Sequence, residues 1–287
     1  MEIRTVLVVG MGAMGRGIAQ VCAQAGYRTL VHDSSPEALG RSIESIRKSV
    51  RKRTERGEWG LEKEKGILAN LRISDFSPGD LGEADIVIEA VTEDPSLKTA
   101  IFRRLDEHCR EEALLGSNTS SIPITLIGSA TKRPERVVGI HFMNPVPTMK
   151  GVEIIRGRVS SDQAMELSRV FVESLGKIPV EAKDYAGFIT SRILNAYLNE
   201  AAFSVMDGNR PEDVDAAAVH CLNMPMGPCR LLDMVGIDVE VYVLGVLQEA
   251  FGEKFRAAPI LKQMVHAGHL GVKSGRGFYA YDVPGKR

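Results

Sequence analysis

A histidine and a glutamate in successive strand-like runs are the residues best suited to acid–base chemistry. His141 follows the apolar run Val137–Ile140 and precedes a turn at Asn144-Pro145. Glu153 comes 12 residues later, in the next apolar run. A base for an alcohol proton needs a pKa near neutrality, which suits imidazole, and a neighbouring carboxylate would orient the ring and stabilise its charged form. Spacing alone also permits a purely structural histidine at the end of a strand.

A glycine-rich motif near the N-terminus predicts a nucleotide site. Gly10-Met11-Gly12-Ala13-Met14-Gly15 fits the pattern G-x-G-x-x-G. The motif directly follows an apolar, β-branched run, Thr5–Val9, and opens a helix that we predict over Met14–Ala25. A second predicted strand, Thr29–His32, leads to Asp33, which lies 18 residues after the last glycine of the motif. This context is typical of a dinucleotide-binding βαβ unit.

Each glycine of this motif has a physical role in holding a dinucleotide. Gly10 permits the tight turn, Gly12 lets the backbone approach the pyrophosphate, and Gly15 allows the helix to pack closely on the sheet. The start of the helix also offers N–H donors and a positive dipole end to the phosphates. The predicted cofactor-binding stretch is therefore Gly10, Met11, Gly12, Ala13, Met14 and Gly15.

The acidic residue after the second strand discriminates between cofactors. Asp33 is expected to accept hydrogen bonds from the ribose hydroxyls of adenosine, where a 2′-phosphate would meet a like charge. No arginine follows Asp33 at once to receive such a phosphate, so the motif favours NAD over NADP. Two alternatives stay open from these residues: FAD bound through the same motif, or a glycine turn with a loop aspartate and no ligand.

Short apolar runs alternate with helical patterns through the first part of the chain, as they do in successive βαβ units. Further strands are predicted at Leu71–Ser74, Ile86–Glu89, Leu114–Ser117, Val137–His141, Val152–Ile155 and Ile178–Val180. A helix is predicted over Asp162–Leu175, between the last two. The pattern predicts an α/β fold with a Rossmann-like, doubly wound and mainly parallel sheet, which would gather the glycine motif and His141 at the carboxyl ends of the strands.

Strand-like runs become scarce beyond residue 183. Helices are predicted over Ile189–Met206, from Pro211 onward and over Asp238–Phe251. We therefore expect an NAD-binding domain over residues 1–183 and an all-α domain over residues 184–287, which is a usual domain size. Since domain clefts are common ligand sites, the substrate is expected in the cleft between these domains.

A long amphipathic helix is predicted after Ser34-Ser35-Pro36, because a hydroxyl cap and a proline suit the first turn. Its apolar stripe is Leu39, Ile43, Ile46 and Val50, and its basic face carries Arg47, Lys48, Arg51, Lys52 and Arg56. Such a face can hold ligand phosphates or be simply solvated. A net charge of −1 and the lack of aromatic platforms beside the helix argue against nucleic-acid binding.

Composition excludes further classes of protein. Hydrophobic residues make up 44% and charged residues 25% of the chain, as in an ordinary globular protein, and no apolar run approaches the ~20 residues of a membrane span. The four cysteines include no C-x-x-C pair and stand beside no histidine cluster, so no metal site is expected. They are typical of buried thiols in a reducing compartment. We expect a cytoplasmic protein, with a cleaved organellar leader as the alternative.

Several motifs resemble those of the 3-hydroxyacyl-CoA dehydrogenase family, in the family's order. They are the runs Ser117-Asn118-Thr119-Ser120-Ser121, His141 to Glu153 (HFMNPVPTMKGVE), Pro225-Met226-Gly227-Pro228, Leu231-Leu232-Asp233 and Lys273 to Tyr279 (KSGRGFY). With the glycine motif, the resemblance extends from Gly10 to Tyr279, nearly the whole chain. It implies a monofunctional, NAD-dependent enzyme of fatty acid β-oxidation. Such an enzyme oxidises (S)-3-hydroxyacyl-CoA to 3-oxoacyl-CoA, or catalyses the reverse reduction, by hydride transfer.

The resemblance also implies roles for the residues that match the family's catalytic motif. His141 would be the general base and Glu153 its partner in a dyad. Ser120 and Asn144 would hydrogen-bond the substrate oxygen and the cofactor. The family usually has an asparagine at the position of Ser191, where it helps to hold the reacting end of the substrate.

Further matches concern the residues that contact NAD and coenzyme A in the family. Glu93 and Lys98 match a pair at the nicotinamide end of NAD, and Lys273 matches a lysine that also reaches the cofactor. Ser45 and Lys52 match positions that contact coenzyme A. The alternatives are an exposed pair of little energetic value for Glu93 and Lys98, and an ordinary surface charge for Lys273.

The serine at position 191 leaves the substrate open. A serine hydroxyl can donate and accept a hydrogen bond, but it is shorter than an asparagine amide, so a water molecule or Asn195, one helical turn on, would have to bridge the gap. The alternative substrate is a small hydroxy acid without CoA, such as carnitine or gulonate. A catalytically silent NAD-binding protein is the third hypothesis. The resemblance further implies a homodimer joined through the helical domains.

Overall fold

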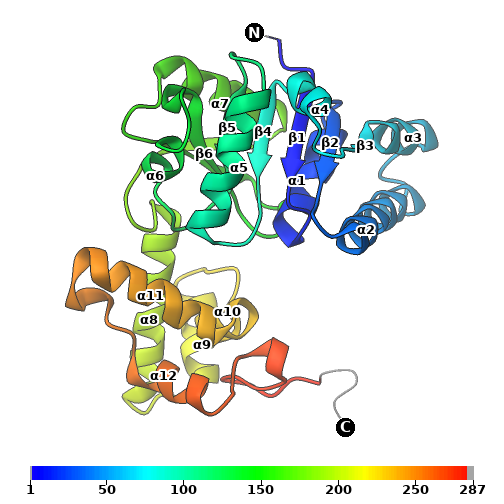
Figure 1. Cartoon of the computed structure of the whole chain (residues 1–287). Helices are drawn as coiled ribbons and strands as arrows, with labels where there is room; N and C mark the ends of the chain where they lie inside the picture. The colour runs from blue at the N-terminus through cyan, green and yellow to red at the C-terminus, as the bar shows by residue number, and fades with distance from the viewer. Residues whose placement is uncertain (1, 283–287) are drawn as a thin grey trace. The chain divides into compact units, whose positions relative to one another are not determined.

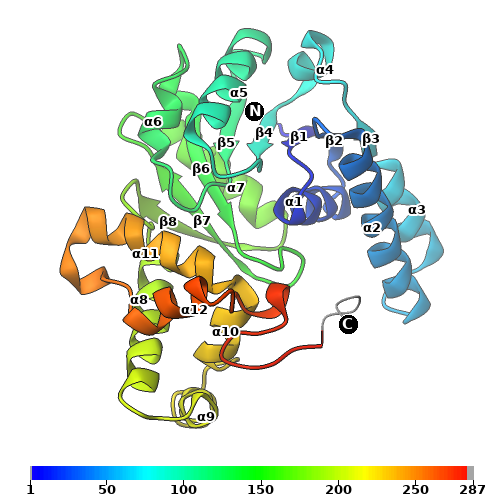
Figure 2. The same ribbon diagram turned by 60° about the horizontal axis from the view of Figure 1, so that its bottom comes forward.

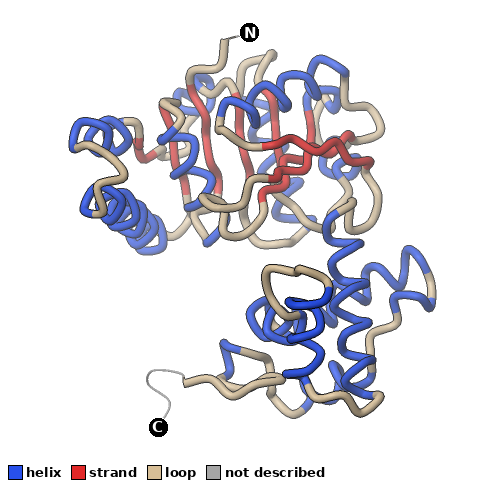
Figure 3. Tube along the Cα trace, turned by 180° about the vertical axis from the view of Figure 1, so that it is seen from behind, coloured by secondary structure: helices blue, strands red, loops and turns tan. Residues whose placement is uncertain are grey.

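The computed structural model describes residues 2–282. The chain divides between Tyr185 and Ala186 into two compact units, two residues beyond the predicted domain boundary. All the named strands belong to the first unit, and the second unit is built from helices and loops (Figure 3). Each unit has its own buried core.

An eight-stranded sheet forms the first unit (Figure 1). Its strands are β1 (Thr5–Val9), β2 (Arg28–His32), β3 (Leu71–Ile73), β4 (Ile86–Glu89), β5 (Leu114–Ser117), β6 (Val137–Phe142), β7 (Gly151–Arg156) and β8 (Ile178–Lys183). Their order is β3-β2-β1-β4-β5-β6-β7-β8. Only the β6–β7 pair is antiparallel. The prediction of a doubly wound, mainly parallel sheet is therefore confirmed.

Helices cover both faces of this sheet, with α5 and α6 on one side and α1 and α7 on the other (Figure 2). Their bounds are α1 (Ala13–Gln24), α5 (Pro95–His108), α6 (Ile124–Gly128) and α7 (Asp162–Ser174). Alternate strand residues such as Val138, Ile140 and Phe142 join the core cluster that contains α1 and α7. Since side chains alternate along a strand, His141 projects from the opposite face, toward the side of α5 and α6.

The amphipathic helix predicted after Pro36 is α2 (Pro36–Glu55), and the Ser35 hydroxyl accepts a hydrogen bond from the backbone N–H of Ala38 at its start. Three of its four predicted stripe residues are buried, and Ile43 is partly buried against the same core. In this unit the sequence analysis assigned no range to α3 (Leu61–Ala69), α4 (Pro78–Glu83), α5, α6 and the 3₁₀ turn η1 (Pro134–Arg136). All of these except α5 are too short for a strong 3.6-residue periodicity.

Asp94 and Pro95 give helix α5 a sharp start. The Asp94 carboxylate accepts hydrogen bonds from the backbone N–H groups of Ser96 and Leu97, at 2.8 and 3.0 Å. Pro95 occupies the first helical position, where no N–H partner is needed. This cap fixes where α5 begins, and therefore where its buried Lys98 lies.

The second unit consists of α8 (Thr190–Met206), α9 (Pro211–Cys221), α10 (Pro228–Val235), α11 (Ile237–Phe251) and α12 (Pro259–His266), with 3₁₀ turns η2 (Glu253–Phe255) and η3 (Val272–Ser274). Leu198, Leu232, Leu244 and Leu261 lie at the centre of its core. The buried carboxylate of Asp233 accepts hydrogen bonds from the backbone N–H groups of Phe278 and Tyr279, which fastens the C-terminal segment to α10. Over residues 2–282 no helix combines the length and the apolar character of a membrane span.

Candidate active site

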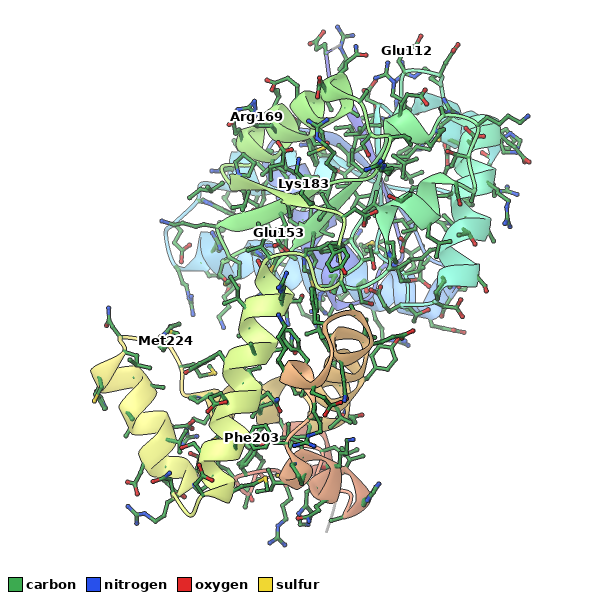
Figure 4. All side chains as sticks on the ribbon, turned by 90° about the vertical axis from the view of Figure 1, so that its left-hand side faces the viewer. Glu112, Glu153, Arg169, Lys183, Phe203 and Met224 are labelled. Carbon is green, nitrogen blue, oxygen red and sulfur yellow. The ribbon has the colours of Figure 1, made fainter. Side chains whose placement is uncertain are left out.

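The antiparallel pairing of β6 and β7 brings the predicted dyad together. His141 and Glu153 are direct partners in the register of the two strands, and residues directly opposite one another project on the same face. The imidazole Nδ1 lies 2.8 Å from Glu153 Oε2. Both residues are buried, with exposures of 6% and 2%. Figure 4 marks Glu153 on the sheet of the first unit.

Ser120 completes a hydrogen-bonded row with this pair. Its Oγ lies 3.0 Å from His141 Nε2, just beyond the carboxyl end of β5. With Nδ1–H donated to the Glu153 carboxylate, Nε2 is the acceptor and takes the hydroxyl hydrogen of Ser120. A substrate hydroxyl at the same point would therefore meet the basic nitrogen. Asn144 is exposed two residues beyond β6.

Glu93 lies at the centre of the turn that carries Ser120. Its Oε1 accepts hydrogen bonds from Thr119 Oγ1, from the backbone N–H groups of Ser120 and Ser121, and from Ser121 Oγ, over 2.5–3.0 Å. Burial alone would raise the pKa of Glu93, but the hydrogen bonds from Thr119 and Ser121 and the charge of Lys98 outweigh it, so this pKa lies below its usual range. Glu93 is therefore a carboxylate at neutral pH and anchors the turn.

Lys98 is buried, with an exposure of 1%. Its Nζ lies 2.7 Å from Glu89 Oε1, 3.4 Å from Glu93 Oε2 and 3.3 Å from the carbonyl oxygen of Val91. The alternative of an exposed surface residue is therefore wrong for Lys98, while the side chain of Glu93 is 31% exposed. Sequence reasoning also missed Glu89, although a carboxylate at the end of the apolar run Ile86–Glu89 was a visible signal.

A cavity of about 520 Å³ lies at the carboxyl ends of β1, β2 and β4. In the order β2-β1-β4 the chain connections leave in opposite directions from β1 and β4, which is where open α/β sheets bind ligands. Its walls include Gly10, Gly12, Ala13, Met14, His32, Asp33, Phe76, Ala90, Leu97 and Ile101. The polar side chains of His32, Asp33, Ser34 and Thr92 line the cavity together with apolar side chains, as expected of a site for a nucleotide.

The protein itself requires glycine at Gly10 and Gly15 for steric reasons, but not at Gly12. A Cβ on Gly15 would lie 1.7 Å from the carbonyl oxygen of Gly10, and a Cβ on Gly10 would lie 2.8 Å from the backbone of Ala90. Gly10 also has a φ of +90°, which L side chains rarely adopt. A Cβ on Gly12 would meet no protein atom within 4 Å, so the fold leaves this position open for a ligand. The arrangement fits a dinucleotide pyrophosphate at the first turn of α1.

Asp33 braces the glycine turn from the end of β2. Its Oδ2 accepts a hydrogen bond from the backbone N–H of Met11 at 2.7 Å, and its Oδ1 accepts one from Ser35 N–H at 2.9 Å. The Met11 side chain is buried in the core. Met11 therefore contributes to the site through the shape of the turn, and its N–H is committed to Asp33. Asp33 itself lines the cavity, where its carboxylate can also face ribose hydroxyls.

Ser45 and Lys52 lie two helical turns apart on α2 and so share one face. Lys52 is exposed and Ser45 is partly buried. Four arginines of this helix or its end have carboxylate neighbours within 4.0 Å, namely Arg47, Arg51, Arg53 and Arg56. Within residues 2–282 no such ion pair involves Lys48 or Lys52, so their charges stay available to an anionic ligand.

The remaining predicted residues belong to the second unit. Ser191 lies in the first turn of α8, and Asn195 donates its side-chain amide to the Ser191 carbonyl oxygen at 2.6 Å. Asn195 is buried, and one N–H of its amide is used inside the helix. Lys273 is about half exposed and forms an ion pair with Asp238 Oδ1 at 2.5 Å.

Comparisons with known proteins identify both units. The family "3-hydroxyacyl-CoA dehydrogenase, NAD binding domain" matches residues 5–185, and "3-hydroxyacyl-CoA dehydrogenase, C-terminal domain" matches residues 187–281. A 3-hydroxybutyryl-CoA dehydrogenase from Mycobacterium tuberculosis is 41% identical over 283 residues, which cover 97% of this chain and 99% of that protein. One from Clostridioides difficile is 39% identical over 281 residues, which cover 96% and 98%.

A solved structure agrees. The crystal structure of (S)-3-hydroxybutyryl-CoA dehydrogenase from Ralstonia eutropha matches this chain with a TM-score of 0.94 and 39% identity, covering 98% of this chain and 100% of that one. The predictions of NAD as the cofactor and of an oxidoreductase that acts on a CH–OH group are thereby confirmed. Both halves of the sequence match in order and over nearly their whole length, and the chain belongs to the 3-hydroxyacyl-CoA dehydrogenase family.

Proposed function

We propose that this protein interconverts (S)-3-hydroxyacyl-CoA and 3-oxoacyl-CoA with NAD, and that His141, Glu153 and Ser120 carry out the proton transfer. The observation that carries the proposal is the row Glu153–His141–Ser120, with contacts of 2.8 and 3.0 Å. This row ends at a hydroxyl beside a basic nitrogen. A 3-hydroxyl that replaced or joined the Ser120 hydroxyl would be deprotonated there.

The residues divide the work of the reaction. NAD, when bound, supplies the acceptor for the hydride that leaves C3 of the substrate. His141 Nε2 takes the hydroxyl proton, and Glu153 stabilises the positive charge that the ring then carries. Ser120 hydrogen-bonds the substrate oxygen and keeps it in line with Nε2. Asn144, exposed beyond β6, would donate its amide to the same oxygen.

The cofactor would be held by the glycine turn and by Asp33. The first turn of α1 has N–H groups that no preceding helical carbonyl accepts, and Gly12 leaves room for a phosphate to approach them. Asp33 would bind the adenosine ribose. Lys98 is enclosed by acceptors, so we propose that it acts on the nicotinamide end through Glu93. For Lys273 to contact the cofactor, its ion pair with Asp238 would have to break.

The CoA moiety would bind to the basic face of α2. Ser45 and Lys52 lie on one face of the helix, and Lys52 has no carboxylate partner in the described part of the chain. Because a phosphate contact by an exposed lysine contributes a charge-assisted hydrogen bond, Lys52→Ala should raise the KM for acetoacetyl-CoA about tenfold. Arg169→Ala is the matched control, since Arg169 is an exposed arginine of α7, outside the basic face of α2, and pairs with Glu166 and Glu173.

Acetoacetyl-CoA reduction, followed by the loss of NADH absorbance, tests the proposed function. Wild-type turnover that His141→Ala abolishes is the expected result. Binding of NADH without turnover of any acyl-CoA would refute the proposal. It would favour the alternative of a small hydroxy acid without CoA, for which Lys52→Ala leaves KM unchanged. Serine at position 191 makes this comparison necessary, because the family usually has an asparagine there that helps to hold the reacting end of the substrate.

We also propose a homodimer in a reducing, cytoplasmic compartment. The second unit exposes several large apolar side chains, including Ile193, Met234 and Tyr242 at 59–65%, and a second copy of the chain would cover them. All four cysteines are free thiols, which is typical of reducing conditions. Sedimentation equilibrium should give twice the mass of one chain, and a monomer at micromolar concentration would refute the dimer.

A further inference from the structure

We propose that Glu89 is a positioning residue for proton transfer, and that it acts through Lys98 and Glu93 on Ser120 and His141. The inference rests on the proposed function, because the reaction of His141 is what Glu89 would serve. It starts from a buried carboxylate that the dyad does not use. Glu89 ends β4 and has an exposure of 0%.

Every oxygen of Glu89 has a donor. Oε1 accepts hydrogen bonds from the backbone N–H of Val91 and from Lys98 Nζ, both at 2.7 Å, and Oε2 accepts one from Ser117 Oγ at 2.7 Å. The side chain therefore joins the ends of β4 and β5 to helix α5. A fully buried carboxylate is costly unless it is paired and hydrogen-bonded, and here both conditions are met at one junction.

Lys98 connects Glu89 to Glu93, which holds the turn after β5. Its ammonium group has three donors, and it lies near three acceptors: Glu89, Glu93 and the carbonyl oxygen of Val91. The distance to Glu89 is 2.7 Å and the distance to Glu93 is 3.4 Å. Glu89 is thus the tighter partner and fixes the position from which the Lys98 charge attracts Glu93.

Glu93 in turn holds the residues that face the imidazole. Its Oε2 is the oxygen nearest Lys98, while its Oε1 receives the backbone N–H of Ser120 at 2.9 Å. Ser120 Oγ then lies 3.0 Å from His141 Nε2. Contacts are continuous from Glu89 to the basic nitrogen, and α5 and the ends of β4, β5 and β6 each supply a link.

The carboxylate of Glu89 is also needed for charge balance. Between Glu89 and Glu93, Lys98 is drawn in two directions by opposite charges. Without the charge of Glu89, Lys98 would pair with Glu93 alone and move toward it, which would shift the acceptor of the Ser120 N–H. A displacement of about 1 Å in a reacting group can reduce the rate about 10²-fold.

Glu89→Gln tests the proposal, because the amide keeps the shape of the side chain and removes its charge. The kcat for acetoacetyl-CoA reduction should fall about 10²-fold, while the dissociation constant for NADH, measured by its fluorescence, should change less than about tenfold, because the glycine turn and Asp33 still hold the adenosine and pyrophosphate. Asp106→Asn is the matched control. Asp106 forms another buried pair in the same unit, at 2.8 Å from Arg133, away from the turn that carries Ser120. The kcat of the Asp106→Asn variant should equal that of the wild type.

The double variant Glu89→Gln/Lys98→Met separates positioning from folding. Replacing both members of a buried pair leaves neither charge uncompensated, so this variant should melt at a higher temperature than Glu89→Gln alone and remains informative if Glu89→Gln does not fold. Its kcat should stay low, because Glu93 has lost the cation that anchors Oε2. Recovery of wild-type kcat in the double variant, or wild-type kcat in Glu89→Gln, would overturn the proposal.

A spectroscopic measurement keeps the proposal separate from the choice of substrate. The ¹⁵N resonance of His141 Nε2, assigned by its loss in His141→Ala, reports the hydrogen bond from Ser120. It should shift in both Glu89 variants and stay in place in Asp106→Asn, even if acetoacetyl-CoA is not a substrate. An unshifted resonance would show that Glu89 does not act on this pair, whatever the protein oxidises.

Discussion

Replacing Glu153 with glutamine should reduce kcat about 10²- to 10³-fold. Glu153 Oε2 lies 2.8 Å from His141 Nδ1, and its side chain is 2% exposed. Glutamine has the same shape but carries no charge. If its amide oxygen accepts from Nδ1–H, the ring keeps its tautomer and loses its counter-charge. If its NH₂ group faces Nδ1 instead, the proton moves to Nε2 and the base is lost.

The magnitude follows from the charge that the reaction creates on the ring. A charge-assisted hydrogen bond contributes about 1.5–3 kcal/mol. Two unit charges ~4 Å apart at an effective dielectric constant of about 20 attract by about 4 kcal/mol. Since about 1.4 kcal/mol corresponds to a tenfold change in rate, a loss of about 3–4 kcal/mol from the transition state gives the expected range.

The assay compares kcat for acetoacetyl-CoA reduction with the melting temperature and the dissociation constant for NADH. Glu181→Gln is the matched control, because Glu181 lies on the adjacent strand opposite Ile154 and pairs with Arg156 at 3.1 Å in an exposed position. Glu153→Gln should keep the melting temperature within about 4 °C of the wild type, since it removes a buried charge. A kcat within tenfold of the wild type, with folding and NADH binding intact, would refute the dyad.

Three further predictions concern the cofactor site and stability. Gly12→Ala should melt like the wild type, because its Cβ would occupy open space, but should bind NADH poorly, because that space is the proposed place of the cofactor phosphates. Gly15→Ala should lose thermal stability, because its Cβ would lie 1.7 Å from the Gly10 carbonyl oxygen. Equal melting temperatures and equal NADH affinities for the two variants, the latter from fluorescence titration, would contradict this prediction. Asp33→Ala should weaken NADH binding about tenfold or more, and unchanged affinity would remove Asp33 from the cofactor site. Burial raises the pKa of Glu240 from an ordinary 4.5 to about 8, so the folded state binds this proton more tightly than the unfolded chain, and the contribution to stability is lost as pH rises from about 4.5 to about 8. Glu240→Gln lacks this loss, so its melting temperature should gain on the wild type as pH rises through that range; a difference that does not change with pH would contradict the assignment.

Local patterns in the sequence were sufficient for most of the sheet and for the nucleotide motif. The runs Thr5–Val9, Ile86–Glu89 and Leu114–Ser117 appear as strands with the predicted bounds, because short, continuous apolar runs bounded by turn residues are typical of buried strands. The glycine turn was also predictable from the sequence. Its geometry depends on positions that no side chain can occupy, such as Gly15 against the carbonyl oxygen of Gly10.

Helices with short or interrupted periodicity were harder to predict. The 9-residue α3 and the 8-residue α10 and α12 passed unnoticed, since two turns give too few apolar repeats to distinguish a helix from a loop. The burial of Lys98 was missed for a different reason. Whether an exposed-looking lysine is enclosed depends on the neighbours that meet it from β4 and the turn after β5, and these are distant in sequence.

Sequence by itself determined which residues are chemically competent: an imidazole and a carboxylate 12 residues apart, a serine in a polar turn, and a glycine turn with its aspartate. Only the tertiary structure decided how they meet. A parallel β6–β7 pair would place residues 12 apart at distant heights, but the observed antiparallel pair makes His141 and Glu153 direct partners. The physical reason is register. Strand direction and alignment are set by pairing across the whole sheet, and that pairing turns a spacing along the chain into a 2.8 Å contact.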